Sequence, residues 1–368
     1  MTFDETLRQV LDEKGRVVGE VPDVPEADLR RLHRHMVMMR LFDQRMLSLQ
    51  RQGRIGFYGM ATGQEAAITG SAYPLRPQDW VFHALRETGV CLWRGTTLQE
   101  LICQLIGNSG DVLIGRQMPM HFSDRKVNSV AWSSVIGTQL VHAMGAAYAA
   151  KLKKDDVVCV GYIGDGGTSS SDFHAALNFA AVWKVPAVFF CQNNQWAISV
   201  PLAAQTVSSS IAIKAVAYGM PGIRVDGNDI LAVIAAQREA VSRAARGEGP
   251  TFIEAVTFRM AGHSSSDDPT RYREAAQVQY WEERDPVARF DAYLRGRGLL
   301  IDSDLETWTT EINEAISQAI TAAEAMPAPG LETIFTDVYA KMPPHIEEQM
   351  KYALSLGLGT KFEGAFPL

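Results

Sequence analysis

The fold is indicated by residues 154–194, KDDVVCVGYIGDGGTSSSDFHAALNFAAVWKVPAVFFCQNN. Residues 154–167 form an apolar run that ends in glycine, which is typical of a strand buried on both faces. Residues 171–184 have helical spacing, and residues 185–194 form a second buried run. A strand, a helix and a strand in this order predict a parallel pair joined by a right-handed crossover.

The flanking sequence repeats the scheme. GIRVDGND (222–229) predicts a short strand and a helix cap, and residues 230–247 predict a helix. TFIEAVTFRMAGH (251–263) predicts a strand that ends at His263, and QDWVF (78–82) predicts another strand. We therefore expect an α/β fold of three layers, with a mostly parallel sheet and helices on both faces.

Helical spacing also occurs outside this region. It predicts helices within residues 29–50, 63–71, 97–107 and 141–152, and again beyond residue 304. Residues 107–130 are rich in Gly, Asn, Ser and Asp, so we expect a long loop that is functional or buried at an interface. Gly and Pro residues up to position 25 predict an extended N-terminal arm.

Charge and cysteine content exclude several classes of protein. The 368 residues carry a formal net charge of −7, so the chain lacks the basic surface that binds nucleic acid or an anionic membrane. The four cysteines have no CxxC or zinc-type spacing, which indicates buried, reduced thiols. The opening residues resemble neither a signal peptide nor a transit sequence, and the apolar runs are too short to span a bilayer. We expect a cytoplasmic protein.

Polar residues are predicted at the carboxyl ends of three strands. Asp165 follows the first strand, Asn194 the second and His263 the third. In an open parallel sheet these ends meet at one edge, where ligands bind. Asp165 and Asn194 are one strand-helix-strand unit apart, so they can share one ion. A carboxylate and an amide suit Mg²⁺, which usually also binds phosphate oxygens, and this predicts a diphosphate ligand.

Glycines surround the carboxylate. Gly164, Gly166 and Gly167 let backbone amides approach phosphate oxygens. The helix that begins near Ser170 adds the positive end of its dipole. GDG alone more often forms a plain turn, and its combination with an NN pair after a second buried strand makes the signal specific.

Segments along most of the chain resemble one family. Residues 164–199, GDGGTSSSDFHAALNFAAVWKVPAVFFCQNNQWAIS, resemble the thiamine-diphosphate motif of 2-oxo acid dehydrogenase alpha subunits. GRIGFYGMATGQEAA, GRQMPMHF, GTQLVHAMGAAYAAK, RVDGNDILAV and GHSSSDDPTRYR follow the same family in order, over residues 30–340. The resemblance implies the thiamine-diphosphate-binding fold. Its expected parts are an N-terminal arm at 1–30, a cofactor-binding α/β domain at 31–305, and a helical extension at 306–368 that packs on the domain and on a partner subunit.

The resemblance also implies roles for individual residues. Asp165, Asn194 and the backbone carbonyl of Trp196 match the ligands of Mg²⁺. The implied cofactor site consists of Phe57, Leu85, Arg86, Ser134, Ile136, Gly164, Asp165, Gly166, Gly167, Asn194, Trp196, Ala197 and His263. Branched-chain relatives hold a potassium ion at the positions of Ser133, Val135, Thr138 and Gln139.

Two of these residues are candidates for catalysis. His263 matches the histidine that faces the reaction centre, and imidazole can give or take a proton near neutral pH. Without the resemblance, a turn residue would be the simpler interpretation. Ser134 is the second candidate, at the aminopyrimidine end of the cofactor. Phe57 matches an aromatic wall of the substrate pocket, with a core residue as the alternative. The remaining histidines have no metal-ligand spacing, and we assign no site to His33, His35, His83, His121, His142 or His174.

Thiamine diphosphate also needs a carboxylate against its aminopyrimidine ring. The sequence offers no convincing glutamate for this role, and in two-chain members of the family the beta subunit supplies it. The resemblance therefore implies a tetramer of two alpha and two beta subunits. It also implies that the acyl product passes to the lipoyl groups of an acyltransferase component.

Four positions depart from the family pattern. Leu85 stands where the family usually has Tyr, Val135 where branched-chain relatives have Pro, Gln192 where Arg or Glu is usual, and Ser170 where Glu is usual. The segments SSDDP, WAISVP and RVDGND still favour the branched-chain type, with 3-methyl-2-oxobutanoate and related 2-oxo acids as substrates.

Three alternatives remain open at this point. Pyruvate or acetoin dehydrogenase is the nearest. A non-catalytic subunit that keeps the fold would explain Leu85 and Ser170. A magnesium-dependent phosphohydrolase with Asp165 as nucleophile is the third, although the sequence lacks a DxD at that position.

Overall fold

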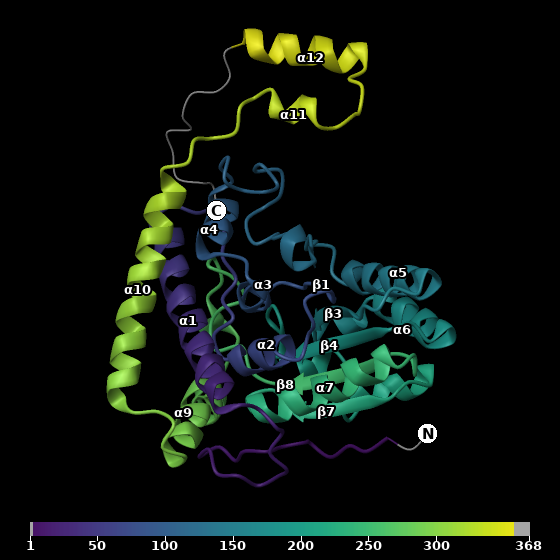
Figure 1. Cartoon of the computed structure of the whole chain (residues 1–368), viewed down its shortest axis with the longest axis vertical. Helices are drawn as coiled ribbons and strands as arrows, with labels where there is room; N and C mark the ends of the chain where they lie inside the picture. Colours follow the sequence, from purple (N-terminus) through teal and green to yellow (C-terminus); the bar gives the residue numbers. More distant parts are fainter. Residues whose placement is uncertain (1–2, 357–368) are drawn as a thin grey trace.

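A parallel sheet forms the centre of the molecule. The computed structural model describes residues 3–356, and Figure 1 shows the sheet flanked by helices. All neighbouring strands of the six-stranded sheet are parallel, in the order β2-β1-β3-β4-β8-β7. The strands are β1 (Trp80–Phe82), β2 (Ser129–Val130), β3 (Cys159–Gly164), β4 (Ala187–Asn193), β7 (Gly222–Asp226) and β8 (Thr251–Val256). The predicted mostly parallel sheet is confirmed.

Helices are found in every segment with predicted helical spacing. They are α1 (Glu26–Arg51), α2 (Glu65–Ala72), α3 (Thr88–Arg94), α4 (Leu98–Ile106), α5 (Thr138–Lys153), α6 (Ser171–Trp183), α7 (Ile230–Ala245), α8 (Ala275–Glu282), α9 (Pro286–Gly296), α10 (Asp302–Glu324), α11 (Thr333–Thr336) and α12 (Pro344–Ser355). Three of these, α3, α8 and α9, are not predicted by the sequence pattern. A separate antiparallel pair consists of β5 (Trp196–Ala197) and β6 (Val200–Pro201). Residues 107–128 are largely irregular, as their composition predicts.

Alternate residues of the strands pack on opposite faces of the sheet. On β3, Val160 and Tyr162 belong to the core shared with α1, α2 and α7. Cys159 and Ile163 belong to the core shared with α5 and α6. Because both faces are covered, the strands read as continuous apolar runs rather than as alternating ones.

Side-chain caps fix the starts of three helices. Thr97 and Glu100 form a capping box at α4. Ser170 Oγ accepts a hydrogen bond from the Phe173 amide at 3.3 Å at the start of α6, and Asp229 accepts from two amides at the start of α7. Such caps satisfy N–H groups that have no partner inside the helix.

The C-terminal part differs in how far it is packed. Ile312, Ile316 and Ile320 of α10 are buried in a cluster with α1 and α4. In contrast, α12 has no buried residue, and it stands away from the body of the molecule in Figure 1. The part of the predicted extension at residues 357–368 lies outside the described residues.

The third strand ends earlier than the sequence predicted. β8 stops at Val256, so His263 lies in the following loop and not at the strand end. Beyond β8, the Thr257 amide still donates to the carbonyl of Asn193, the last residue of β4, whereas the Met260 amide donates to the Thr62 carbonyl in the loop before α2. Phe258 is nevertheless buried, so the apolar pattern continues after the strand ladder has ended.

No helix within residues 3–356 combines the length and the apolar character needed to cross a membrane.

Candidate functional site

A cavity of about 530 Å³ lies where β3 and β4 end. All thirteen residues of the implied cofactor site line it: Phe57, Leu85, Arg86, Ser134, Ile136, Gly164, Asp165, Gly166, Gly167, Asn194, Trp196, Ala197 and His263. They come from six separate segments of the chain, so the fold brings them together. Their binding roles stay predictions.

Asp165 supplies a buried carboxylate. Its residue is 1% exposed, and burial raises the pKa of the carboxyl group. Gln205 Nε2 donates to Asp165 Oδ2 at 2.8 Å, which together with the Asn194 amide partly offsets that rise. The positive charge of Arg259 favours the ionised form of Asp165, but these two side chains do not form an ion pair with each other. A buried carboxylate of this kind is suited to a cation from outside the chain.

Asn194 and Trp196 lie beside this carboxylate. Asn194 Nδ2 donates to Gln64 Oε1 at 3.1 Å, so its Oδ1 faces the other way, toward the Trp196 amide at 3.3 Å. The carbonyl of Trp196 accepts a 3.3 Å hydrogen bond from Arg259 Nη1. The three predicted oxygen ligands are a carboxylate, an amide and a carbonyl, which are the groups that Mg²⁺ prefers.

The glycine loop is shaped by close contacts. A Cβ on Gly166 would lie 2.5 Å from the Cβ of Ala197, and one on Gly167 would lie 2.5 Å from Ile163 Cγ1. A Cβ on Gly164 would meet no protein atom within 4 Å, so at this position the cavity is open. Residues 166–169 form a 3-10 turn, and α6 begins at Ser171 with Ser170 as its N-cap, as the sequence predicts.

Arg86 supplies a buried cation. It donates to the carbonyl of Met60 and, at 2.7 Å, to the carbonyl of His263. No carboxylate in the described part of the chain forms an ion pair with it, and burial lowers the pKa of its guanidinium to about 10. A phosphate group is the natural partner for such a side chain.

His263 lies in the loop after β8, next to Arg86. Arg86 Nη2 contacts His263 Nδ1 at 3.4 Å, and because a guanidinium only donates, this contact favours the tautomer with the proton on Nε2. Burial, with Arg86 and Arg259 nearby, lowers the pKa of His263 to about 4. The imidazole is therefore neutral near pH 7 and can accept a proton.

Part of the cavity wall is apolar and aromatic. Its walls include Phe57, Leu85, Met118, Trp132 and Ile136. Met118 and Ile136 are 61% and 44% exposed, so the mouth of the cavity carries apolar side chains that the chain itself leaves uncovered.

The residues implied in potassium binding do not line this cavity. Gln139 Oε1 accepts from the Gly137 amide at 3.1 Å, and the Thr138 hydroxyl donates to Asp172 at 3.4 Å. Ser133 Oγ accepts from the Val135 amide at 3.2 Å. The potassium site stays a prediction. Groups of three or more His, Cys, Asp or Glu arranged for a metal are likewise absent from residues 3–356.

Sequence reasoning missed several residues that line the cavity. They are Gln64, Ala84, Glu87, Met118, His121, Trp132, Gln192, Ile198 and Arg259. Glu87 follows the matched Arg86, and His121 lies in the quoted segment GRQMPMHF, so the resemblance itself contained the signal. Burial raises the pKa of Glu87 to about 7. Its carboxyl oxygens accept from Gln192 Nε2 and, at 2.8 Å, from the Ala84 amide.

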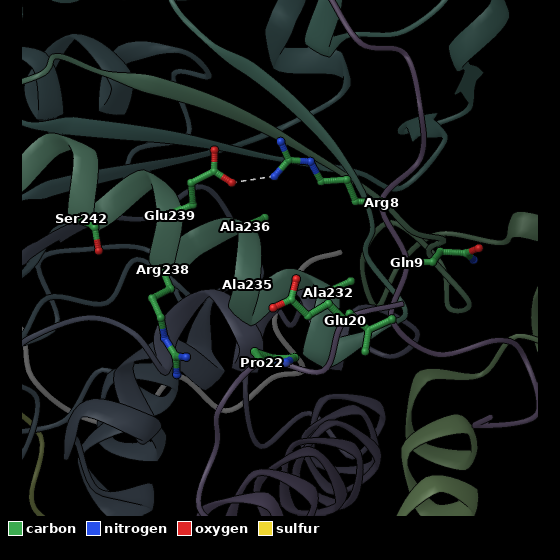
Figure 2. Close-up of a pocket in the computed structure, with 11 residues that line it drawn as sticks. Arg8, Gln9, Glu20, Pro22, Ala232, Ala235, Ala236, Arg238, Glu239 and Ser242 are labelled. Atoms are coloured by element: carbon green, nitrogen blue, oxygen red, sulfur yellow. Dashed lines mark hydrogen bonds and ion pairs between the residues drawn. The ribbon is translucent and has the colours of Figure 1, made fainter. Parts of the chain in front are cut away.

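A second pocket, of about 490 Å³, lies between the N-terminal arm and α7 (Figure 2). Its charged side chains are either exposed, as Glu20 is, or hydrogen-bonded within the chain. Arg8 and Glu239 form an ion pair at 2.7 Å, each with a side chain 48% exposed, and Arg238 donates to the carbonyl of Asp23. Nothing in this lining resembles the buried charges of the first cavity.

Comparisons with known proteins agree with the geometry. Residues 33–332 match the model of the family described as the dehydrogenase E1 component. The chain is 43% identical over 344 residues to 2-oxoisovalerate dehydrogenase subunit alpha 2 of Arabidopsis thaliana, which covers 93% of this chain and 73% of that protein.

Two bacterial relatives are named for different substrates. The chain is 44% identical over 329 residues to the 3-methyl-2-oxobutanoate dehydrogenase subunit alpha of Mycobacterium tuberculosis, covering 89% of this chain and 87% of the relative. It is 41% identical over 348 residues to the pyruvate dehydrogenase E1 component subunit alpha of Bacillus cereus, covering 94% and 91%.

Proposed function

The chain belongs to the dehydrogenase E1 component family, and we propose that it is the alpha subunit of a branched-chain 2-oxo acid dehydrogenase. The reaction is the oxidative decarboxylation of 3-methyl-2-oxobutanoate and related 2-oxo acids, with transfer of the acyl group to a lipoyl group. Relatives named for this substrate class, at 43–44% identity over most of the chain, support the proposal.

One observation carries the cofactor assignment. Within residues 3–356, Asp165 is a buried carboxylate without an ion-pairing cation and Arg86 is a buried guanidinium without an ion-pairing anion, and both line the same cavity. Mg²⁺ bound to a diphosphate supplies both missing charges at once. Asp165, Asn194 and the Trp196 carbonyl would hold the metal, while Arg86 and the amides of the glycine loop would hold the phosphates.

The apolar and aromatic part of the cavity wall would receive the ring system of thiamine diphosphate. When bound, this cofactor supplies the electron sink for decarboxylation. In the tautomer that the contact with Arg86 favours, His263 would hold its proton on Nε2 beside the reaction centre, and Phe57 and Leu85 would exclude water from the substrate. The low pKa of His263 keeps its imidazole available as a base at neutral pH.

We propose that a beta subunit completes the site, in a tetramer of two alpha and two beta subunits. The exposed apolar side chains Met118, Ile136 and Ile198 at the cavity mouth support this, because such groups mark interfaces. Glu87 lines the cavity, but both of its carboxyl oxygens are hydrogen-bonded within the chain. The carboxylate for the aminopyrimidine ring would therefore come from the partner.

Further assembly follows from the same proposal. Residues 31–305 would form the cofactor domain, with residues 1–30 as an arm, and residues 306–368 would pack on this domain and on the beta subunit. The unburied face of α12 supports that last role. The acyl product would pass to a lipoyl-bearing acyltransferase component. The four free, buried cysteines support a reducing compartment, and hence a cytoplasmic location.

Turnover of two substrates tests the assignment. The alpha chain, purified with its beta subunit, is given 3-methyl-2-oxobutanoate or pyruvate, and lipoamide reduction is followed. We expect the branched-chain acid to have the higher kcat/KM. A much faster reaction with pyruvate would make this a pyruvate dehydrogenase, the alternative that the 41% identical Bacillus protein supports.

Calorimetry addresses the non-catalytic alternative. We expect heat of thiamine diphosphate binding to the assembled tetramer in the presence of Mg²⁺, and no binding heat would leave a subunit that only keeps the fold.

One departure from the family already has a structural explanation. Ser170 caps α6 and donates to the Gly167 carbonyl at 2.8 Å, so it supports the glycine loop.

A further inference from the structure

His121 is buried in the wall of the cavity, against Trp132, although it lies in the long irregular loop. Two hydrogen bonds from Gln104 of α4 hold the backbone just before it: Nε2 donates to the Met118 carbonyl at 2.8 Å, and Oε1 accepts from the Met120 amide at 3.0 Å. Met120 has a φ of +74°, a conformation that costs a non-glycine residue energy and persists only when its surroundings impose it. The loop is thus built to place His121.

The imidazole of His121 has one hydrogen-bond partner on each nitrogen. Nδ1 lies 3.2 Å from the carbonyl of Pro119, and Nε2 lies 2.7 Å from Ser134 Oγ. A carbonyl can only accept, so Nδ1 carries the proton. In the neutral ring Nε2 then accepts, and the hydroxyl of Ser134 must be the donor.

The neutral form is the one that the surroundings favour. His121 is 4% exposed, its ring centroid is 3.9 Å from that of Trp132, and burial lowers the pKa of the imidazole. The nearby Met118 and Pro119 carbonyls, which favour the protonated ring, offset this only in part. His121 therefore acts on Ser134 as a fixed acceptor.

This arrangement determines what Ser134 offers to a ligand. A hydroxyl has one proton and two lone pairs, and its proton is committed to His121. Both residues line the cavity, where the neighbouring walls are aromatic or aliphatic. Ser134 Oγ can therefore serve a bound molecule only as an acceptor, and the complementary ligand group is an N–H on a flat, mainly apolar ring.

We propose that His121 is a positioning residue that locks Ser134 Oγ as the acceptor for the amino group on the pyrimidine ring of the cofactor. This inference rests on the proposed function and adds a residue to it that sequence reasoning left without a role. His121 itself does not touch the cofactor in this scheme, because both of its ring nitrogens are engaged within the chain.

Three variants separate the hydrogen bond from plain packing. His121→Phe keeps a ring against Trp132 but removes the acceptor, His121→Gln places an amide oxygen near the position of Nε2, and Ser134→Ala removes the hydroxyl. Each is assembled with the beta subunit, and the affinity for thiamine diphosphate with Mg²⁺ is measured by calorimetry. We expect His121→Phe and Ser134→Ala to weaken binding about fivefold each, which is the scale of one hydrogen bond, and His121→Gln to restore it to within about twofold.

The double variant provides the decisive result. If His121 acts through Ser134, then His121→Phe combined with Ser134→Ala binds no more weakly than Ser134→Ala alone. Additive losses, or an equal loss in His121→Gln and His121→Phe, would mean that the histidine only fills space, and would overturn the inference. Thermal melting of each variant identifies any that is simply unfolded, and the cycle is then repeated with Ser134→Cys and His121→Asn.

A cofactor analogue tests the ligand group. For a thiamine diphosphate analogue that lacks the amino group on its pyrimidine ring, we expect unaltered protein and both single variants to bind alike. A fivefold loss that persisted with this analogue would also overturn the inference. Failure of the unaltered tetramer to bind thiamine diphosphate would instead overturn the proposed function, so the two failures are distinguishable.

Discussion

The cavity at the ends of β3 and β4 and the pocket beneath the N-terminal arm are nearly equal in volume, about 530 and about 490 Å³. Their charged groups differ. In the first, Asp165 and Arg86 are 1% and 4% exposed and lack ion-pair partners within the described chain. In the second, Arg8 and Glu239 are half exposed and paired with each other.

The difference identifies the functional cavity by energy rather than by size. Burying an unpaired charge costs several kcal/mol, and a chain that keeps such groups gains from a ligand that neutralises them. An exposed ion pair contributes only about 0–1 kcal/mol and needs no ligand.

Asp165→Ala should abolish cofactor binding and lipoamide reduction in the assembled enzyme, because it removes the only predicted ligand that carries a charge. The change also removes a buried carboxylate, so the melting temperature should stay the same or rise. Calorimetry and turnover measure the first effect, and thermal melting measures the second. Retention of most of the turnover would place the metal elsewhere.

His263→Asn should lower kcat roughly 100-fold, the smaller end of the range for losing a general acid or base, with cofactor affinity changed only a few-fold. Burial lowers the pKa of His263 to about 4, so the part of the activity that needs a neutral imidazole should persist as pH falls to about 5 and then decline. The pH profile of kcat in unaltered enzyme and in His263→Asn gives the comparison. A decline centred near pH 6.5 would mean that the ring is solvated.

The glycine loop offers a matched pair of substitutions. Gly164→Ala adds a methyl group that meets no protein atom within 4 Å, so it should leave the melting temperature unchanged while weakening cofactor binding about tenfold, since the methyl group takes cavity space. Gly166→Ala places its methyl group 2.5 Å from Ala197 Cβ, and should also lower the free energy of unfolding by about 1–3 kcal/mol. Equal melting temperatures for the two variants would contradict the contact geometry.

Glu239→Ala in the second pocket should have the smallest effect. Breaking its ion pair with Arg8 should change the free energy of unfolding by no more than about 1 kcal/mol, because both side chains are half exposed. Cofactor affinity and turnover should match those of the unaltered enzyme. A marked loss of turnover would show that the two cavities are not as different as their burial indicates.

The sequence predicted more of the sheet than of the loops. Buried strands such as β3 and β4 read as apolar runs because both faces of the sheet are covered, and this signal is local. The same signal predicts the wrong end for β8. Phe258 stays buried beyond the last strand residue, Val256, so the apolar pattern predicts a strand that extends to His263. Burial can be predicted from the apolar residues of a segment, whereas the partner of a backbone hydrogen bond cannot.

A parallel α/β sheet, the carboxylate and the amide at two neighbouring strand ends and, through a resemblance along most of the chain, the cofactor that they suit could all be predicted from the sequence. The contacts between distant side chains became visible only in the fold: Glu87 meets Gln192, His121 meets Ser134, and Arg259 lines the same cavity. The difference arises from the separation along the chain of the residues that interact. Periodicity reports which side of a strand or helix is buried, while contacts between distant loops depend on how the whole chain packs.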